Sequence, residues 1–309
     1  MNTLLNKKKY LICWDNEFIR YIVSGYSNEI TIIPLSYSQT DSIFKKILKK
    51  ACNVLGFKFI AYYLSIEKQV LREIKSIDDN SLLIIIGIEV DLFHKVLHSI
   101  IPGNTEKYLW LWNKIREDDV NFLESIKKYN YSISSFDKND ANKYNLIYKQ
   151  QFYRYPSKTE FEYSIHSDFY FMGHNHGRRN VIDLLKSELN SEKFSTNFIV
   201  SENPFDFNVS YFKNIDYIYE TRCVVDIPQK GQLGLTLRVL EALFFNKKLI
   251  TTNVDICNYD FYNSANIFIW SVDNLLDLKR FLETPYQSIS DEIVFKYSVD
   301  YFINNISQK

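Results

Sequence analysis

The sequence predicts an α/β protein built from two doubly wound, Rossmann-like domains. Short apolar segments with strand character alternate with segments whose apolar residues recur every three or four positions, the spacing of a helix that packs on a sheet. The alternation restarts in the second half of the chain, and 309 residues are enough for two domains with separate cores. We therefore expect two parallel sheets, each covered by helices on both faces.

The first domain is predicted over residues 1–155. Its strands are expected at 10–14, 30–35, 59–64, 82–88, 107–112 and 133–136. Its helices are expected at 18–23, at 41–55, around Leu71 and Ile74, at 90–100 and at 119–128. Asp137 and Asp140 are typical of a turn and a helix cap. A linker at 153–159, which contains Pro156, leads out of this domain.

The second domain is predicted over residues 156–290. Its strands are expected at 168–172, 197–201, 223–227, 249–252 and 267–270, with helices at 180–189, after Gly234 and at 272–282. The aromatic stretch between 202 and 220 is expected to be irregular. A last helix at 291–306, beyond Pro285, belongs to a C-terminal segment at 291–309.

Composition excludes several classes of function. The formal net charge is zero, which gives a nucleic-acid partner no global electrostatic support. The four cysteines form no C-x-x-C pair, which indicates reduced thiols. The N-terminus lacks the apolar stretch of a signal peptide, and the most apolar run, 82–90, is far short of the ~20 residues that span a bilayer. We expect a cytoplasmic protein, either soluble or peripheral at the inner membrane.

The stretch from Cys223 to Asn253 carries the most chemical information. It consists of a buried strand, a loop with two glycines, a helix and a second strand. Arg238 and Glu241 lie three residues apart on the helix and project together. A guanidinium can hold phosphate oxygens and a carboxylate can accept from the hydroxyls of a sugar, so the pair suits half of a nucleotide-sugar site. An ordinary surface ion pair is the alternative.

The run GLTLRVLEALFFNKKLITTN resembles the donor-domain signature of bacterial envelope-polysaccharide glycosyltransferases with the GT-B fold. The resemblance is to the CgeB-like and lipopolysaccharide (O-antigen, capsule) biosynthesis group. A second run, SSFDKNDANKYNLIYKQQFY, is similar to the end of the N-terminal domain in that group. The insertion at 231–234 departs from the simplest form of the signature.

This resemblance implies a metal-independent glycosyltransferase whose two domains face each other across a cleft. The second domain would hold a nucleotide-sugar donor, which is a substrate and not a cofactor, and the first a glycan or lipid-linked acceptor. Glu241 would bind the ribose, and Arg238 the diphosphate. The loop residues Lys230, Gly234, Leu235 and Thr236 would lie beside that diphosphate. The C-terminal helix would return to the first domain.

A second glycine-containing turn, GHNHGRR, follows the predicted strand at 168–172. In an open parallel sheet such turns lie at the edge where ligands bind. Gly173 and Gly177 permit a tight backbone path, and Arg178 adds positive charge, so we expect Gly173, His174, Gly177 and Arg178 to contact phosphate. A charged surface turn is one alternative. A metal site is another, but His174 and His176 lack further ligands at suitable spacing.

The catalytic groups are predicted from the charge that sugar transfer develops. Arg238 is the first candidate for the group that stabilises the negative charge of the leaving diphosphate, and Lys230 and Arg178 are the next candidates. An inverting enzyme also needs a base from the first domain, where Asp15 follows one predicted strand and Glu89, with Asp91 as its alternative, follows another. Both residue types are common as caps, and a retaining enzyme needs no such base. The sequence leaves the stereochemistry, the donor sugar, the base, the acceptor and the linkage open.

The helix at 41–55 places Ile43, Ile47, Ala51 and Val54 on one face and lysines on the other. A basic amphipathic helix suits docking to anionic lipid, whereas a domain helix with a solvated lysine face is the preferred interpretation. Two other functions remain: a nucleotide-sugar epimerase or hydrolase on the same fold, and a non-catalytic nucleotide-binding assembly protein.

Overall fold

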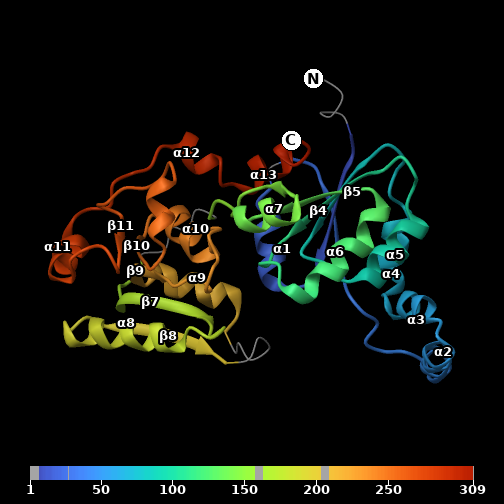
Figure 1. The fold of residues 1–309 in the computed structure, drawn as a ribbon, viewed down its shortest axis with the longest axis horizontal. Helices are drawn as coiled ribbons and strands as arrows, with labels where there is room; N and C mark the ends of the chain where they lie inside the picture. The colour runs from blue at the N-terminus through green and yellow to red at the C-terminus, as the bar shows by residue number, and fades with distance from the viewer. Residues whose placement is uncertain (1–6, 27, 157–162, 203–208, 309) are drawn as a thin grey trace. The chain divides into compact units, whose positions relative to one another are not determined.

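The computed structural model describes residues 7–26, 28–156, 163–202 and 209–308 (Figure 1). It divides into two compact units, Met1–Lys149 with Ile306–Lys309, and Gln150–Asn305. Each unit is a parallel sheet flanked by helices, so the predicted α/β class with two Rossmann-like domains is confirmed. The three residues 157–159 of the predicted linker lie outside the described residues.

The N-terminal unit holds six parallel strands in the order β2-β1-β3-β4-β5-β6. The strands are β1 (Lys9–Trp14), β2 (Thr31–Leu35), β3 (Leu82–Ile86), β4 (Glu106–Leu111), β5 (Tyr131–Ser135) and β6 (Ile147–Tyr148). The helices are α1 (Glu17–Val23), α2 (Ile43–Val54), α3 (Lys58–Ser65), α4 (Lys68–Lys75), α5 (Asp91–Ile100), α6 (Val120–Ile126) and α7 (Lys138–Tyr144), with short 3₁₀ turns η1 (Glu117–Asp119) and η2 (Lys127–Tyr129).

Strand β3 lies at the centre of this unit, and all five of its residues are buried. Successive side chains of a strand point to opposite faces, so a strand covered on both faces must be apolar throughout. Leu83 and Ile85 pack with apolar residues of α4, α5 and α6. Figure 1 shows α1 on the other side of the sheet from α4, α5 and α6.

The C-terminal unit holds five parallel strands in the order β11-β10-β9-β7-β8. The strands are β7 (Ser167–His174), β8 (Thr196–Ser201), β9 (Thr221–Asp226), β10 (Lys248–Thr251) and β11 (Ile267–Ile269). The helices are α8 (Arg179–Ser191), α9 (Tyr211–Tyr219), α10 (Leu237–Phe244), α11 (Leu278–Glu283), α12 (Asp291–Phe295) and α13 (Val299–Asn305), with 3₁₀ turns η3 (Val254–Asn258) and η4 (Leu275–Asp277).

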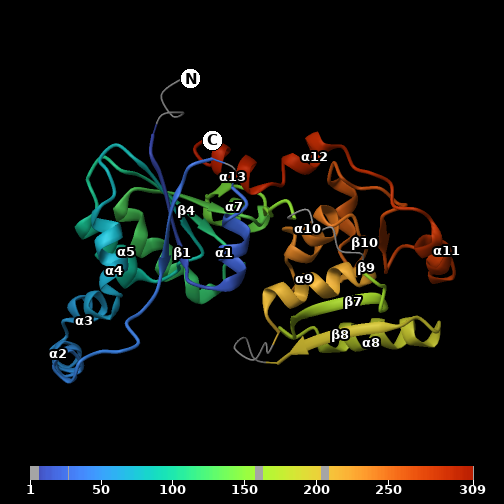
Figure 2. The same cartoon turned by 180° about the vertical axis from the view of Figure 1, so that it is seen from behind.

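Strand β7 lies between two helical layers, and Figure 2 shows α8 on one side of it and α9 on the other. Phe169 and Phe171 pack in a core with apolar residues of α8 and α11. Tyr170, between them, points to the opposite face, where its hydroxyl donates to Asn214 of α9 at 2.8 Å. The C-terminal unit is therefore a three-layer sandwich, like the N-terminal one.

Two predicted segments differ from the structure. The apolar run at 59–64, expected to be a strand, belongs to α3, which packs against α2 and α5. A short apolar run does not distinguish a strand from a helix, because tertiary contacts decide between them. The stretch at 202–220, expected to be irregular, contains α9, which begins where the Ser210 side chain accepts from the Lys213 amide.

The expected single helix at 291–306 is divided into α12 and α13. The Tyr153 amide donates to the Tyr297 carbonyl, and the Val299 amide donates to the Tyr153 carbonyl. This bridge uses backbone groups that a continuous helix would need, so the helix is interrupted at Ser298. The helix expected at 272–282 is likewise shorter, with η4 leading into α11.

Candidate functional site

The C-terminal unit has a topological switch point between β7 and β9. Strand β8 lies on one side of β7, and β9, β10 and β11 follow on the other. The connections after β7 and β9 therefore leave the carboxyl ends of these strands in opposite directions. Ligands of open α/β sheets bind at this place.

Two arginines meet at this edge. Arg178, directly before α8, donates from Nε and Nη2 to the His174 carbonyl at 3.1 and 2.9 Å, and from Nη1 to the Ile227 carbonyl. Arg238, in the first turn of α10, donates from Nη1 to the Met172 carbonyl and from Nη2 to the Ile227 carbonyl, both at 3.3 Å. Both guanidinium groups therefore link the end of β7 to the segment that follows β9.

Gly173 makes room for the two guanidinium groups. A Cβ atom at this position would lie 3.1 Å from Arg178 Nη2, 3.2 Å from Arg238 Nη1 and 3.0 Å from Phe171 Cζ. The Phe171 ring lies beneath both cations, with its centroid 5.7 Å from the central carbon of Arg178 and 5.2 Å from that of Arg238. A methyl group at this position would therefore have to push the guanidinium groups aside by a few tenths of an ångström.

Asp226 is the acidic partner of this cluster. It ends β9, is 1% exposed, and accepts from the hydroxyls of Thr236 at 2.6 Å and Thr251 at 2.9 Å. Arg238 Nη2 lies 3.3 Å from it. One carboxylate thus faces two guanidinium groups. Burial, and then the charge of Arg238, lower the pKa of Arg178 to about 9.

The two histidines of the turn do not add charge to the cluster. Burial lowers the pKa of His174 and of His176, and the positive charges of Arg178 and Arg238 lower them further. Their rings lie 5.5 Å apart. Within the described parts of the chain, His, Cys, Asp and Glu side chains form no group of three that could hold a metal ion.

The predicted turn at 173–179 begins later than expected. Strand β7 continues through Gly173 and His174, so the turn itself is short. His176 has φ +44° and Gly177 has φ +74°, both in the left-handed region that reverses the chain tightly. Arg178, which is 8% exposed, is therefore directed back over the end of β7 instead of into solvent.

Glu241 takes a different direction from Arg238. It is 5% exposed, and its Oε1 accepts from the Tyr211 hydroxyl at 2.8 Å and from Asn214 Nδ2 at 3.0 Å. Burial raises its pKa. The carboxylate joins α10 to α9, and the Tyr211 hydroxyl also contacts that of Tyr153 at 2.6 Å. The ribose role of Glu241 stays a prediction.

The residues of the loop before α10 differ in how they contribute to the carboxyl edge of the sheet. Thr236 precedes α10 and fixes Asp226, whereas Leu235 is buried at 2% exposure and supports the core. The Gly234 carbonyl accepts from Gln232 Nε2 at 3.2 Å. Lys230 is exposed. The structure thus brings together Gly173, His174, Arg178, Thr236 and Arg238 from the predicted set.

The N-terminal unit has its own switch point, between β1 and β3, which β2 and β4 flank. Asp15 follows β1 and is paired with Arg20 at the surface. Glu89 follows β3, and its Oε1 is buried without a hydrogen-bond partner within the described residues. Burial, and then the charge of Asp119, raise the pKa of Glu89 to about 7. A carboxylate with this pKa suits proton transfer near neutral pH.

Aromatic side chains, which the sequence patterns did not single out, line this second edge. Trp14 Nε1 donates to the Gly87 carbonyl at 2.9 Å and so links the ends of β1 and β3. The Trp112 ring meets Phe18 edge-on at 5.2 Å and Trp110 at 4.9 Å. Three of the four tryptophans of the chain lie at or near these strand ends, and their position after apolar runs is the sequence pattern from which this aromatic edge could have been predicted.

Asp226, in the C-terminal unit, was also not among the predicted site residues. The pattern that could have identified it is an acidic residue at the end of an apolar strand.

Comparison with known proteins finds only distant likenesses. No family model matches the sequence, and no curated protein matches it significantly. Among solved structures, the Glycosylation Associate Protein (Gap123) complex from Streptococcus agalactiae is 14% identical, with a TM-score of 0.41 over 78% of this chain and 56% of the other. The accessory secretory protein 1, 2 and 3 structure from Streptococcus pneumoniae is 12% identical, with a TM-score of 0.38 over 82% and 57%.

A third solved structure, the spinosyn forosaminyltransferase SpnP, is 9% identical, with a TM-score of 0.36 over 97% of this chain and 90% of the other. The chain spans just over half the length of the two streptococcal chains. The names of these proteins concern glycosylation, accessory secretion or glycosyl transfer, and no activity or partner is carried over from them. The assignment to the CgeB-like group stays a prediction.

Proposed function

We propose that this protein is a glycosyltransferase whose C-terminal unit binds the diphosphate of a nucleotide-sugar donor. The observation that supports this most is the meeting of Arg178 and Arg238 at the switch point of the second sheet. Two guanidinium groups share one carbonyl and one carboxylate there, so the local charge favours a further anion. Arg238 Nε is buried and has no hydrogen-bond partner within the described part of the chain.

The chemistry of sugar transfer matches these groups. Breaking the bond between the anomeric carbon and the phosphate oxygen places negative charge on the leaving diphosphate. Fixed guanidinium groups stabilise that charge without reorganisation, and they replace the divalent metal that other transferases use for this task. Lys230, Gly234 and Leu235 remain candidates for further diphosphate contacts, and Glu241 for the ribose.

The N-terminal unit is proposed to bind the acceptor. Trp14 and Trp112 offer apolar ring faces of the kind that cover a sugar, and Glu89 is the first candidate for the base. Its carboxylate would take the proton of the acceptor hydroxyl as the oxygen attacks the anomeric carbon, which inverts configuration. Asp15 is the second candidate, because its carboxylate is held by Arg20.

The biological setting in this proposal rests on the sequence resemblance alone. The runs at 234–253 and 134–153 are similar to those of enzymes that assemble bacterial lipopolysaccharide, O-antigen or capsule. The proposed reaction is therefore transfer to a glycan or a lipid-linked acceptor at the cytoplasmic side of the inner membrane. The cleft between two facing domains is likewise an expectation of that resemblance.

Thermal unfolding in the presence of UDP-, GDP-, dTDP- and CMP-sugars tests the donor site. A ligand at 100 times its dissociation constant adds about 2.7 kcal/mol to stability, which is an easily measured shift. Arg238→Ala removes a charged hydrogen-bond donor, so we expect about 10- to 100-fold weaker binding. The matched control is Arg280→Ala, because Arg280 is an exposed arginine of the same unit whose one acidic partner among the described residues is Asp277.

Turnover distinguishes the proposal from its alternatives. Release of the nucleotide, which is a nucleoside diphosphate or, from a CMP-sugar, CMP, only when an acceptor is present supports a transferase. Release without an acceptor, or interconversion of the donor sugar, indicates a hydrolase or an epimerase. Donor binding without any turnover indicates a nucleotide-binding assembly protein. If no nucleotide sugar shifts the unfolding temperature, Arg178 and Arg238 serve only to cap the carbonyl groups at the sheet edge, and the proposal fails.

A further inference from the structure

The apolar face of α2 is open to solvent. The sequence favoured a domain helix with a solvated lysine face; Lys46 and Lys50 are indeed exposed, but the apolar face is exposed with them. Ile43 is 78% exposed, Ile47 is 62% exposed and Val54 is 78% exposed. Phe44 on the same helix and Phe57 just beyond it are exposed as well. Apolar residues scattered singly on a surface are normal, but a continuous face of this kind marks an interaction site.

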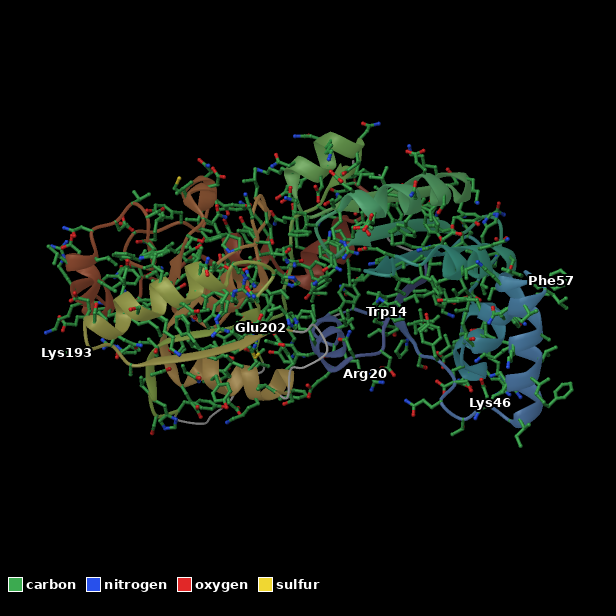
Figure 3. The ribbon with its side chains drawn as sticks, turned by 60° about the horizontal axis from the view of Figure 1, so that its bottom comes forward. Trp14, Arg20, Lys46, Phe57, Lys193 and Glu202 are labelled. Atoms are coloured by element: carbon green, nitrogen blue, oxygen red, sulfur yellow. The ribbon has the colours of Figure 1, made fainter. Side chains whose placement is uncertain are left out.

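The position of α2 explains why this face is uncovered. The helix packs chiefly against α3, and α3 packs against α5, so α2 is two layers away from the sheet. Cys52 is its buried residue. In Figures 1 and 2, α2 lies at the extremity of the N-terminal unit. Figure 3 shows the helix at that edge, with Lys46 along it and Phe57 beyond its C-terminal end.

The surroundings of the apolar face are strongly basic. Between Ser42 and Ile66 the chain has five lysines and no Asp or Glu. Asp41, which precedes this segment, pairs with Lys45 and Lys49, both at 2.7 Å. Lys46 and Lys50 remain exposed beside the apolar residues. The surface thus combines solvent-exposed apolar side chains with a net positive charge.

A groove next to α2 collects further cations. Its volume is about 280 Å³, and its walls come from α2, α3 and α4. Lys68, Arg72 and Lys75 lie four and three residues apart on α4, so they share one face and line the groove together with Lys45. Within the described residues, Lys68 and Arg72 have no acidic partner within 4.0 Å. Lys75 donates to the Tyr63 hydroxyl at 3.0 Å.

We propose that α2 and this groove dock the protein onto an anionic phospholipid surface. The apolar residues of α2 would enter the boundary between headgroups and acyl chains, and the groove would hold a lipid phosphate. The charge pattern favours this occupant over a second copy of the chain, since two such faces would bring like charges together. A nucleic acid would use the cations but leave the apolar face exposed to water.

Vesicle flotation measures this binding directly. We compare vesicles of phosphatidylcholine alone with vesicles that contain 30% phosphatidylglycerol, at about 0.1 M salt, where the Debye length is about 10 Å. The wild-type chain is expected to float with the anionic vesicles only, and to be released at high salt. No nucleotide sugar is needed, so the result is independent of the proposed transferase activity.

Two double variants separate the two parts of the surface. Phe44→Ser with Ile47→Ser removes apolar burial and is expected to weaken partitioning at least ~10-fold. Lys68→Glu with Arg72→Glu reverses two charges near the leaflet. Since one lysine contributes about five-fold there, the loss is expected to be about 25-fold or more. All four positions are exposed or line the groove, so circular dichroism and melting should stay at the wild-type level.

The second unit supplies matched controls. Val272→Ser with Leu276→Ser changes two apolar residues that are as exposed as those of α2, and Lys279→Glu with Arg280→Glu makes the same change in net charge. Both controls should bind vesicles like the wild type. Equal binding to neutral and anionic vesicles, equal losses in the controls, or no flotation at all would overturn the proposal. So would a dimer that Phe44→Ser with Ile47→Ser converts to a monomer, because the occupant would then be a second copy.

Discussion

The two sheets share one plan and differ in the side chains that come after their strands. In each unit the first strand has the second strand on one side and the third on the other, and the next strands continue from the third. In the N-terminal unit the switch point carries Asp15 and Glu89 with tryptophans around them. In the C-terminal unit the corresponding place carries Arg178 and Arg238. One topology thus presents carboxylates in one unit and guanidinium groups in the other.

This difference shows how fold and chemistry are divided. The strand order fixes where a crevice opens, because the connections diverge there, but it does not fix what the crevice binds. The carboxylates of the two switch points also differ in burial. Asp226 is 1% exposed and held by two hydroxyls, whereas Asp15 lies at the surface. Substitutions at corresponding places should therefore have unequal effects.

The largest expected effect is that of Asp226→Ala. The change leaves the Arg238 guanidinium without its acidic partner and the hydroxyls of Thr236 and Thr251 without an acceptor. Removing one partner of a buried charge pair costs about 3–5 kcal/mol. Asp15→Ala breaks only a surface pair and should cost less than about 1 kcal/mol. Denaturant unfolding of both variants checks the contrast, and equal losses would show that Asp226 is not the central support of its edge.

The pH dependence of stability sharpens the comparison at Glu89. Its pKa rises from 4.5 to about 7 in the folded protein because burial disfavours the charged form. Below pH 4.5 both states are protonated and the contribution of Glu89 is fully present. Between pH 4.5 and 7 the unfolded state loses its proton first, so stability falls as pH rises, by a total of about 3 kcal/mol. Above pH 7 this cost is constant.

Glu89→Gln should remove this pH dependence of the free energy of unfolding. The variant stays neutral in both states, so it should gain stability over the wild type at pH 8 and show a flatter curve between pH 4.5 and 7. Unfolding in denaturant at a series of pH values measures the effect. Asp15→Asn is the control at the same edge. A wild-type slope that survives Glu89→Gln would mean that the folded protein does not raise the pKa of Glu89.

The smallest expected effect separates two glycines. Gly87, at the first switch point, has φ +63°, and a Cβ there would lie 3.1 Å from the Cβ of Trp112. Gly173 has no such backbone constraint, and its added Cβ would meet the ends of two arginine side chains and the Phe171 ring. Gly87→Ala should therefore lower the free energy of unfolding by about 1–2 kcal/mol more than the same substitution at a glycine with negative φ. Gly173→Ala should cost less than Gly87→Ala.

The same variant should still affect the second site. A methyl group at Gly173 displaces the Arg178 and Arg238 guanidinium groups by a few tenths of an ångström or more. We expect weaker nucleotide-sugar binding with little loss of stability. Calorimetric titration alongside thermal unfolding checks both expectations. If Gly173→Ala were the more destabilising of the two glycine variants, the guanidinium groups would have to be held more rigidly than the terminal atoms of flexible side chains normally are.

Local patterns in the sequence were enough to predict the alternation of strands and helices, the positions of most strands, and the placement of Arg238 at the start of a helix that follows a buried strand. These features depend on local periodicity, which sequence records directly. Arg178 and Gly173 were likewise identified from a turn at the carboxyl edge of a strand. The apolar run at 59–64 was misassigned because its length fits both a strand and a helix.

The directions of neighbouring side chains on one helix depend instead on the folded protein. Arg238 and Glu241 are one turn apart, yet Arg238 extends over the end of β7 while Glu241 is enclosed by Tyr211 and Asn214 of α9. Likewise, the amphipathic pattern of α2 does not specify which of its faces is covered. Burial is a property of the groups that pack against a residue, and those neighbours are distant in the chain, so no local pattern contains it.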